Sequence, residues 1–254
     1  MSRIQIETLG KSFDGRQVLQ NISLTLEPGR SLALIGPTAA GKTVLLKCLV
    51  GLYAPDEGTI RVDGADVTSP DMRAETLDDR IGMLFQQNAL FDSLSVWENI
   101  GFRLMARGST SAAARARAEE LLPQVGLPIE TADLFPADLS GGMQKRVGFA
   151  RAIATAPDIL LLDNPTAGLD PILAARIDAM ISSLARKNGA TVISATGNMV
   201  GLTQGYDDIA VLHDGALRWH GDADRAEKDD NPWLRQLLSG SRAGPIETIN
   251  IEVQ

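Results

Sequence analysis

The sequence has little of what several large classes of protein require. Cysteine occurs once, at Cys48, so no internal disulfide can form and a reducing cytoplasm is the expected compartment. No stretch of 18 or more apolar residues occurs, and residues 1–5 lack the apolar core of a signal peptide. We therefore expect a chain that does not span a membrane and that reaches one only through a partner.

Basic residues are also scarce relative to acidic ones. The chain has 24 Lys and Arg against 32 Asp and Glu, which gives a formal net charge of −8. A surface that follows a nucleic-acid backbone needs clustered positive charge, so this balance disfavours nucleic acid as a partner. It does not exclude phosphate binding in one dedicated pocket.

What is present is a repeated alternation of strand and helix patterns. Continuous apolar runs or polar–apolar alternation predict strands over residues 4–9, 19–27, 31–35, 59–62, 159–163, 191–195, 209–213 and 216–220. Helical patterns run over residues 42–50, 111–125 and 171–187, and the stretch 86–154 is mainly helical. Such alternation predicts an α/β fold in which helices cover a parallel sheet.

One glycine-rich loop carries a strong chemical signal. Between strand 31–35 and helix 42–50 stand the residues Gly36, Pro37, Thr38, Ala39, Ala40, Gly41, Lys42 and Thr43, which fit the phosphate-loop pattern G-x4-G-K-S/T. Glycines let backbone N–H groups turn toward phosphate oxygens, and the following helix presents its positive N-terminal end to the same anion. Lys42 adds a full charge, and the Thr43 hydroxyl can coordinate Mg²⁺. The alternative is a glycine-rich turn without a ligand.

Asp163 strengthens the nucleotide interpretation. It ends the apolar strand 159–163 and therefore lies at the carboxyl edge of the predicted sheet, where ligands of open α/β sheets bind. Phosphate-loop proteins hold Mg²⁺ with an aspartate at such a position. Alone, this residue could cap a helix. Together with the loop it predicts binding of ATP with Mg²⁺.

Two further segments resemble those of a known family. Residues 139–146, Leu-Ser-Gly-Gly-Met-Gln-Lys-Arg, resemble the LSGGQ signature of ABC ATPases, and residues 162–171, Leu-Asp-Asn-Pro-Thr-Ala-Gly-Leu-Asp-Pro, resemble the Walker B segment and D-loop. With the phosphate loop, Gln86 and a strand ending at Thr196-Gly197, they stand in the family's order. The resemblance covers nearly the whole chain.

The resemblance implies a P-loop NTPase fold of ABC type. A mostly parallel core sheet is then accompanied by an N-terminal antiparallel β subdomain and an inserted helical subdomain at about residues 87–154. The nucleotide-binding domain would cover residues 1–238, and residues 239–254 would form a C-terminal tail.

The resemblance also implies roles for single residues. Phe13 would stack on adenine with Val18 beside it, Val44 would contact the nucleotide, and Gln86 would touch Mg²⁺ and sense the membrane subunit. The implied metal ligands are Thr43, Gln86 and Asp163, and the implied catalytic positions are Lys42, Gln86, Asp163, Asn164 and Gly197. The remaining implied nucleotide contacts are Ser140, Gly141, Gly142 and Asp170.

The signature residues would act on a second subunit. Ser140, Gly141 and Gly142 would meet the γ-phosphate of ATP bound to the opposite copy, because they leave bare N–H groups at a helix N-terminus. Two copies, or this chain and a related ATPase, would sandwich two ATP molecules. An integral-membrane permease would hold them peripherally at the cytoplasmic side of the inner membrane.

Two catalytic positions depart from the family pattern. Asn164 stands where the family has the glutamate that polarises the attacking water, and Gly197 stands where it has a histidine. An amide can orient water but cannot take its proton, and loss of a general base costs about 10² to 10⁴ in rate. The hypothesis is therefore tight ATP binding, ATP-driven dimerisation and slow hydrolysis.

A narrower resemblance concerns the transported substrate. Residues 83–86, 89–94, 231–238 and 244–246 look like those of the ATPase in Mla-type phospholipid transporters, which pairs with a permease and, through it, an MCE-type lipid-binding protein. Two alternatives stay open. One is a non-transport ABC ATPase, such as one that assembles iron–sulfur clusters, and the other is a degenerate regulatory subunit that binds ATP without turnover.

Overall fold

The computed structural model describes residues 2–69, 77, 80–199 and 201–247, and its strands form two sheets. The N-terminal sheet is antiparallel with the order β2-β1-β4-β5. Its strands are β1 (Ile4–Phe13), β2 (Arg16–Leu26), β4 (Glu57–Val62) and β5 (Ala65–Asp66). Between β1 and β2, Asp14 and Gly15 have φ values of 49° and 77°. Two positive φ values in succession are typical of the tight turns that join twisted antiparallel strands.

The core sheet has six strands in the order β10-β9-β3-β8-β7-β6. All neighbours pair in parallel except β9 and β10, which form an antiparallel hairpin. The strands are β3 (Ser31–Ile35), β6 (Ile81–Leu84), β7 (Ile159–Asp163), β8 (Thr191–Ala195), β9 (Asp208–His213) and β10 (Ala216–Asp222). The mostly parallel core sheet and the antiparallel N-terminal sheet expected from the sequence are both present.

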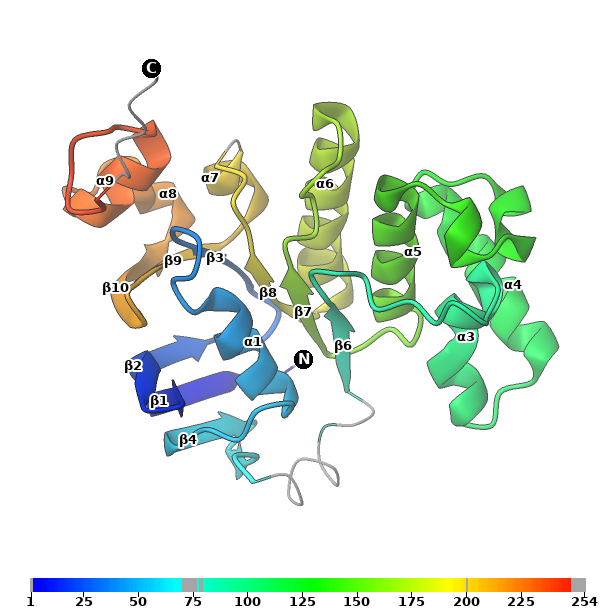
Figure 1. The fold of residues 1–254 in the computed structure, drawn as a ribbon, viewed down its shortest axis with the longest axis horizontal. Helices are drawn as coiled ribbons and strands as arrows, with labels where there is room; N and C mark the ends of the chain where they lie inside the picture. Colours follow the sequence, from blue (N-terminus) through cyan, green and yellow to red (C-terminus); the bar gives the residue numbers. More distant parts are fainter. Residues whose placement is uncertain (1, 70–76, 78–79, 200, 248–254) are drawn as a thin grey trace.

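Helices cover both faces of the core sheet and form a lobe beside it. Figure 1 shows α3, α4 and α5 grouped beyond the edge strand β6, while α1 lies between the two sheets. The α-helices with described bounds are α1 (Lys42–Val50), α3 (Val96–Ala106), α4 (Ser111–Gln124), α5 (Gly141–Ile153), α6 (Pro171–Asn188), α7 (Leu202–Gly205), α8 (Ala223–Ala226) and α9 (Pro232–Ser239), and short 3₁₀ helices cover Ile129–Asp133 and Pro136–Asp138. Among the described residues, none of these is long and apolar enough to cross a membrane.

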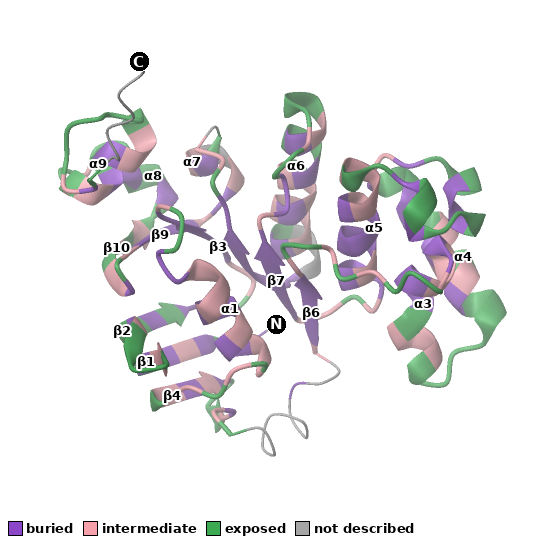
Figure 2. Cartoon of the chain, viewed as in Figure 1, coloured by how far each residue is buried: buried purple, intermediate pink, exposed green. Residues whose placement is uncertain are grey.

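Alternate residues of the core strands feed two separate hydrophobic clusters. In β7, Leu160 and Leu162 pack with residues of α5 and α6, whereas Ile159 and Leu161 pack with residues of α1 and the N-terminal sheet. This double burial explains why the core strands read as continuous apolar runs. Figure 2 shows these strands as the buried centre of the molecule. Cys48 on α1 is fully buried in the second cluster, as its apolar neighbours in sequence predict.

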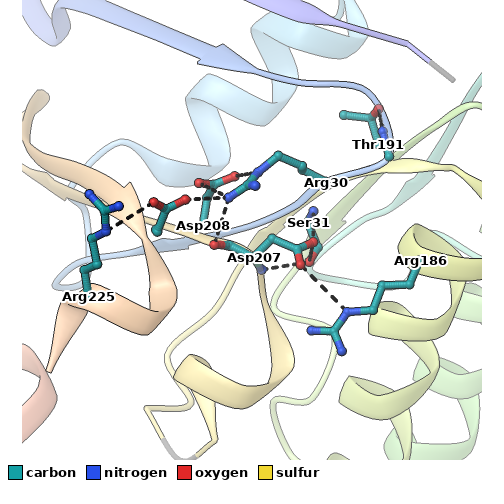
Figure 3. A network of polar contacts seen from close by, with 9 residues as sticks. Arg30, Ser31, Arg186, Thr191, Asp207, Asp208 and Arg225 are labelled. Carbon is teal, nitrogen blue, oxygen red and sulfur yellow. Dashed lines mark hydrogen bonds and ion pairs between the residues drawn. The ribbon is translucent and has the colours of Figure 1, made fainter.

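An ionic network holds the amino end of the core sheet together (Figure 3). The Arg30 guanidinium donates to both carboxylate oxygens of Asp208, at 2.6 and 2.8 Å, and to Asp222 at 2.9 Å. Asp207 accepts hydrogen bonds from the backbone and the hydroxyl of Ser31 and lies 3.7 Å from Arg186 of α6. The network therefore fixes β3, β9, β10 and α6 at the end of the sheet opposite to the phosphate loop.

The expected tail, residues 239–254, lies partly outside the described residues. Its first part turns back on α9, because the Gln236 side chain accepts from the Ile246 amide at 2.7 Å and donates to the Ile246 carbonyl at 2.9 Å. Both residues are buried. Ile246 thus anchors this part of the tail to α9, while residues 241–244 are exposed.

Candidate nucleotide site

The glycines of the phosphate loop sit where no side chain fits. Gly36 has a φ of 153°, and a Cβ there would collide with the carbonyl oxygen of Leu212. Gly41, the N-cap residue of α1, has a φ of 103°, and a Cβ there would lie 2.8 Å from Leu19 Cδ2 and 3.0 Å from the Val18 carbonyl oxygen. The loop is therefore pressed against β2 and β9. It leads directly into the N-terminus of α1, the end of a helix that attracts anions.

Lys42 places its charge over this loop. Its Nζ donates to the carbonyl oxygens of Gly36 and Pro37, both at 2.8 Å. Burial lowers the pKa of Lys42, and the nearby charge of Asp163 opposes this lowering. The ammonium is thus held at the mouth of the loop, where the phosphates of a nucleotide would meet it.

Thr43 and Asp163 form the pair that fits a magnesium ion. Asp163 ends β7 and is 1% exposed. Burial raises the pKa of the Asp163 carboxyl, whereas a hydrogen bond with Thr43 and the charges of Lys42, Lys47 and Lys145 lower it. Its Oδ1 atom is buried and has no hydrogen-bond partner within the described part of the chain. A hydroxyl beside a carboxylate with a free oxygen suits Mg²⁺, which takes few protein ligands and completes its shell with phosphate and water.

A cavity of about 750 Å³ brings together residues from distant parts of the sequence. Of the predicted site residues, its lining contains Val18, Gly36, Thr38, Ala39, Ala40, Gly41, Lys42, Thr43, Val44, Gln86, Asn164 and Gly197. Its volume suits a nucleotide-sized ligand. Arg16, Gln17, Gln20, Asp214 and Gly215 also line it and carry no motif that would have revealed them. They reach the cavity only because the β1–β2 and β9–β10 hairpins pack against the loop.

Phe13 lies apart from the lining of this cavity. The residue is 36% exposed, and its ring meets Tyr53 edge-on, with the ring centroids 5.0 Å apart. Lys11 Nζ lies 5.3 Å from the centroid of the same ring. A contact between Phe13 and adenine therefore stays a prediction.

The signature residues and Asp170 also lie outside this cavity. Ser140 caps α5 by accepting from the Met143 amide at 3.3 Å, and open space surrounds the Cβ position of Gly141. Asp170 caps α6 by accepting from the amides of Ile172 and Leu173, both at 3.0 Å. The exposed start of α5 suits a contact with a second copy. The Asp170 carboxylate, by contrast, caps the N-terminus of α6 in its own chain.

The two positions that depart from the family pattern stand together at the cavity wall. Asn164 has a φ of 53°, a left-handed conformation that Asn adopts more readily than most residues. Its backbone N–H donates to the Ala195 carbonyl oxygen at 2.8 Å. This bond holds the start of the turn that follows β7 against the end of β8. Gly197 has open space around its Cβ position.

A second cavity, of about 820 Å³, shares Asn164 and Gly197 with the first. Its lining includes Asp178 of α6, which accepts a 3.3 Å hydrogen bond from the Asn198 side chain. Burial raises the pKa of Asp178 to about 6. The folded state therefore holds this proton more tightly than the unfolded state does, and stability falls as the pH rises from about 4 to about 6.

We expect Asp178→Asn to stabilise the protein above pH 6 but not below pH 4. A pKa raised by about two units corresponds to about 3 kcal/mol, which we reduce to about 2 kcal/mol because the side chain is partly exposed. Urea unfolding at pH 4 and pH 7 measures the difference between variant and wild type. Asp92→Asn, at an exposed position, is the control. An equal difference at both pH values would contradict the assignment.

Residues 19–167 match the family described as ABC transporter. The chain belongs to this family. It is the ATP-binding subunit of an ABC transporter. The ATPases of this family bind and hydrolyse ATP, typically with Mg²⁺, and act as dimers beside a membrane permease.

Curated relatives and solved structures agree with this assignment. The chain is 35% identical over 246 residues to the "Probable ribonucleotide transport ATP-binding protein mkl" of Mycobacterium bovis, covering 96% of this chain and 68% of that protein. It is 34% identical to the protein TRIGALACTOSYLDIACYLGLYCEROL 3, chloroplastic, of Arabidopsis thaliana, covering 96% and 75%. A dimeric ATP-binding cassette in a post-hydrolysis state bound to ADP and Pi superposes with a TM-score of 0.82 at 29% identity, covering 87% of this chain and 98% of that one. The predicted P-loop fold of ABC type is confirmed.

Proposed function

We propose that this chain is the energy-coupling ATPase of a transporter for phospholipid or another hydrophobic substrate, and that it hydrolyses ATP slowly. The observation that carries the ATP part of the proposal is the 750 Å³ cavity, which brings the phosphate loop, Gln86 and Asn164 to one place. The magnesium part rests on Thr43 and the free oxygen of Asp163 beside it.

Each group has a distinct task in this proposal. The loop amides and Lys42 bind the phosphates, and Thr43 and Asp163, with Gln86, would hold Mg²⁺, which supplies positive charge to the phosphate oxygens. Ser140, Gly141 and Gly142 face the nucleotide of a second copy. Catalysis of phosphoryl transfer depends mainly on such positioning and electrostatics. ATP that binds the closed dimer better than the open one drives closure.

Slow hydrolysis follows from Asn164 and Gly197, which line the same cavity as the phosphate loop. The Asn164 amide can orient the attacking water but cannot accept its proton, and Gly197 offers only backbone at the neighbouring position. Glutamine, another amide, orients water in some GTPases. We therefore infer measurable turnover at a rate below that of relatives with a carboxylate at this position.

The substrate and partners rest on narrower support. The name of one relative contains that of a galactolipid, and the name of another refers to ribonucleotide transport. The names of the relatives therefore do not agree on one substrate. Residues 83–86, 89–94 and 231–238 favour the lipid assignment through their resemblance to Mla-type ATPases. The proposal accordingly includes a permease at the cytoplasmic side of the inner membrane and an MCE-type lipid-binding protein.

Isolation of the tagged chain from detergent-solubilised native membranes tests the proposal. A transporter ATPase brings a multi-span permease with it, and the complex cleaves ATP faster in phospholipid nanodiscs than the isolated chain does. A soluble assembly without a permease would favour the non-transport alternative. A permease complex that binds ATP without any cleavage would favour the regulatory alternative.

A further inference from the structure

Lys145 is a buried lysine that stands one turn into the signature helix. It is 8% exposed and belongs to the face of α5 that packs inward. Burying an ammonium group is costly unless it is paired and hydrogen-bonded. Packing alone therefore does not explain why a lysine is buried at this position, and its polar contacts do.

Those contacts hold the turn that begins at Asn164. Lys145 Nζ donates to the carbonyl oxygen of Asn164 at 3.1 Å and to that of Ala167 at 3.0 Å. The Ala167 amide donates to the same Asn164 carbonyl at 3.3 Å, so the ammonium joins both ends of one four-residue turn. Burial lowers the pKa of Lys145, and the charge of Asp163 opposes this lowering. The ammonium and the Asp163 carboxylate thus stabilise each other's charge.

A second contact links α5 to the segment that contains this turn. A Cβ built on Gly142 would lie 3.3 Å from Leu169 Cδ2, which places the start of α5 in contact with the segment that follows the turn. Asn164 is held in a left-handed conformation, with φ at 53°. Such a conformation is unfavourable for a residue other than glycine and persists where surrounding contacts impose it.

We propose that Lys145 is a positioning residue for hydrolysis, which holds the Asn164–Ala167 turn so that the Asn164 side chain faces the nucleotide cavity. The inference rests on the proposed function. It adds a mechanical link within one subunit: the signature residues at positions 140–142 start the helix that carries Lys145, and Lys145 fixes the water-orienting position. A displacement of α5, when its N-terminus meets the ATP of the other copy, is passed to Asn164 of its own copy.

The test compares ATP binding with ATP cleavage in variants of position 145. We expect Lys145→Met to slow single-turnover cleavage of radiolabelled ATP by about tenfold to a hundredfold, because a displacement of about 1 Å at a reacting centre has an effect of that size. The Kd for ATP stays unchanged, since Lys145 does not line the cavity. Lys145→Gln recovers part of the rate, because its amide still donates hydrogen bonds.

A double-mutant cycle with Asn164→Gly separates positioning from other effects. Glycine adopts the left-handed conformation without strain and removes the side chain that Lys145 positions. Lys145→Met therefore slows the wild-type protein but not the Asn164→Gly protein. Equal slowing in both backgrounds, or a loss of ATP affinity in step with the rate, would overturn the inference. If Lys145→Met does not fold, Lys145→Gln carries the same comparison.

Arg117→Met provides the matched control. Arg117 Nε donates to the carbonyl oxygen of Ala154, the C-cap residue of α5, at 3.1 Å, at the opposite end of the helix from Gly142. Its loss removes a basic side chain that supports the same helix, and we expect the cleavage rate to stay at the wild-type value. This test also separates a failure of the proposed function from a failure of the role of Lys145. If the proposed function is wrong, neither the wild type nor Asn164→Glu cleaves ATP. If both cleave ATP and Lys145→Met matches its parent, only the role of Lys145 is wrong.

Discussion

Replacing Asn164 with glutamate raises the rate of single-turnover ATP cleavage by about 10² to 10⁴. Asn164 lines the nucleotide cavity beside the phosphate loop, Gln86 and Gly197. A carboxylate at this point can accept the proton of the attacking water, which the amide cannot do. Rapid-quench measurement with enzyme in excess over ATP follows the chemical step without interference from product release.

Asn164→Gln is the matched control for this variant, because glutamine has the length of glutamate without its basicity. We expect its rate to stay near that of the wild type. Asn164→Glu should also lower the free energy of unfolding by about 1 kcal/mol, since position 164 has a left-handed φ of 53° that asparagine tolerates better. A wild type that already cleaves ATP as fast as Asn164→Glu would contradict the prediction of slow hydrolysis.

Replacing Lys42 with methionine weakens ATP binding by about 30-fold to 4,000-fold. Removal of one partner from a buried, hydrogen-bonded charge pair costs about 2 to 5 kcal/mol, and each 1.4 kcal/mol changes affinity tenfold. Lys42 is the ammonium that the loop itself holds, 2.8 Å from the carbonyl oxygens of Gly36 and Pro37. Titration with ATP by calorimetry gives the two dissociation constants.

Lys228→Met controls for the change in net charge, because Lys228 is exposed at the end of α8. We expect its affinity for ATP to equal that of the wild type. Thermal unfolding without nucleotide should show that Lys42→Met is folded. A folded Lys42→Met protein that binds ATP as tightly as the wild type would show that the phosphates do not enter this loop.

Features encoded in short stretches of sequence were predictable. The phosphate loop, the strand that ends at Asp163 and the helix over residues 171–187 each carry their own pattern, and the structure places them where that pattern requires. The strand β6 (Ile81–Leu84) was missed as an element, because four residues without flanking turn signals give too little periodicity to recognise.

Features that arise from packing between distant segments were not predictable. Arg16 and Asp214 line the cavity because two hairpins converge on it, and neither belongs to a nucleotide motif. Asp178 and Asn198 face each other only when α6 packs beside the end of β8. In the sequence, Lys145 is one more basic residue of the signature segment, and only its burial against the Asn164 turn gives it a role.

The lifetime of the ATP-bound dimer tests the central claim most directly. Size-exclusion chromatography with light scattering, at successive times after ATP and Mg²⁺ are mixed with the protein, measures this lifetime. Slow hydrolysis predicts that the wild-type chain forms a dimer that outlasts the Asn164→Glu dimer by the ratio of their cleavage rates. A wild-type dimer that decays as fast as the Asn164→Glu dimer would contradict the account.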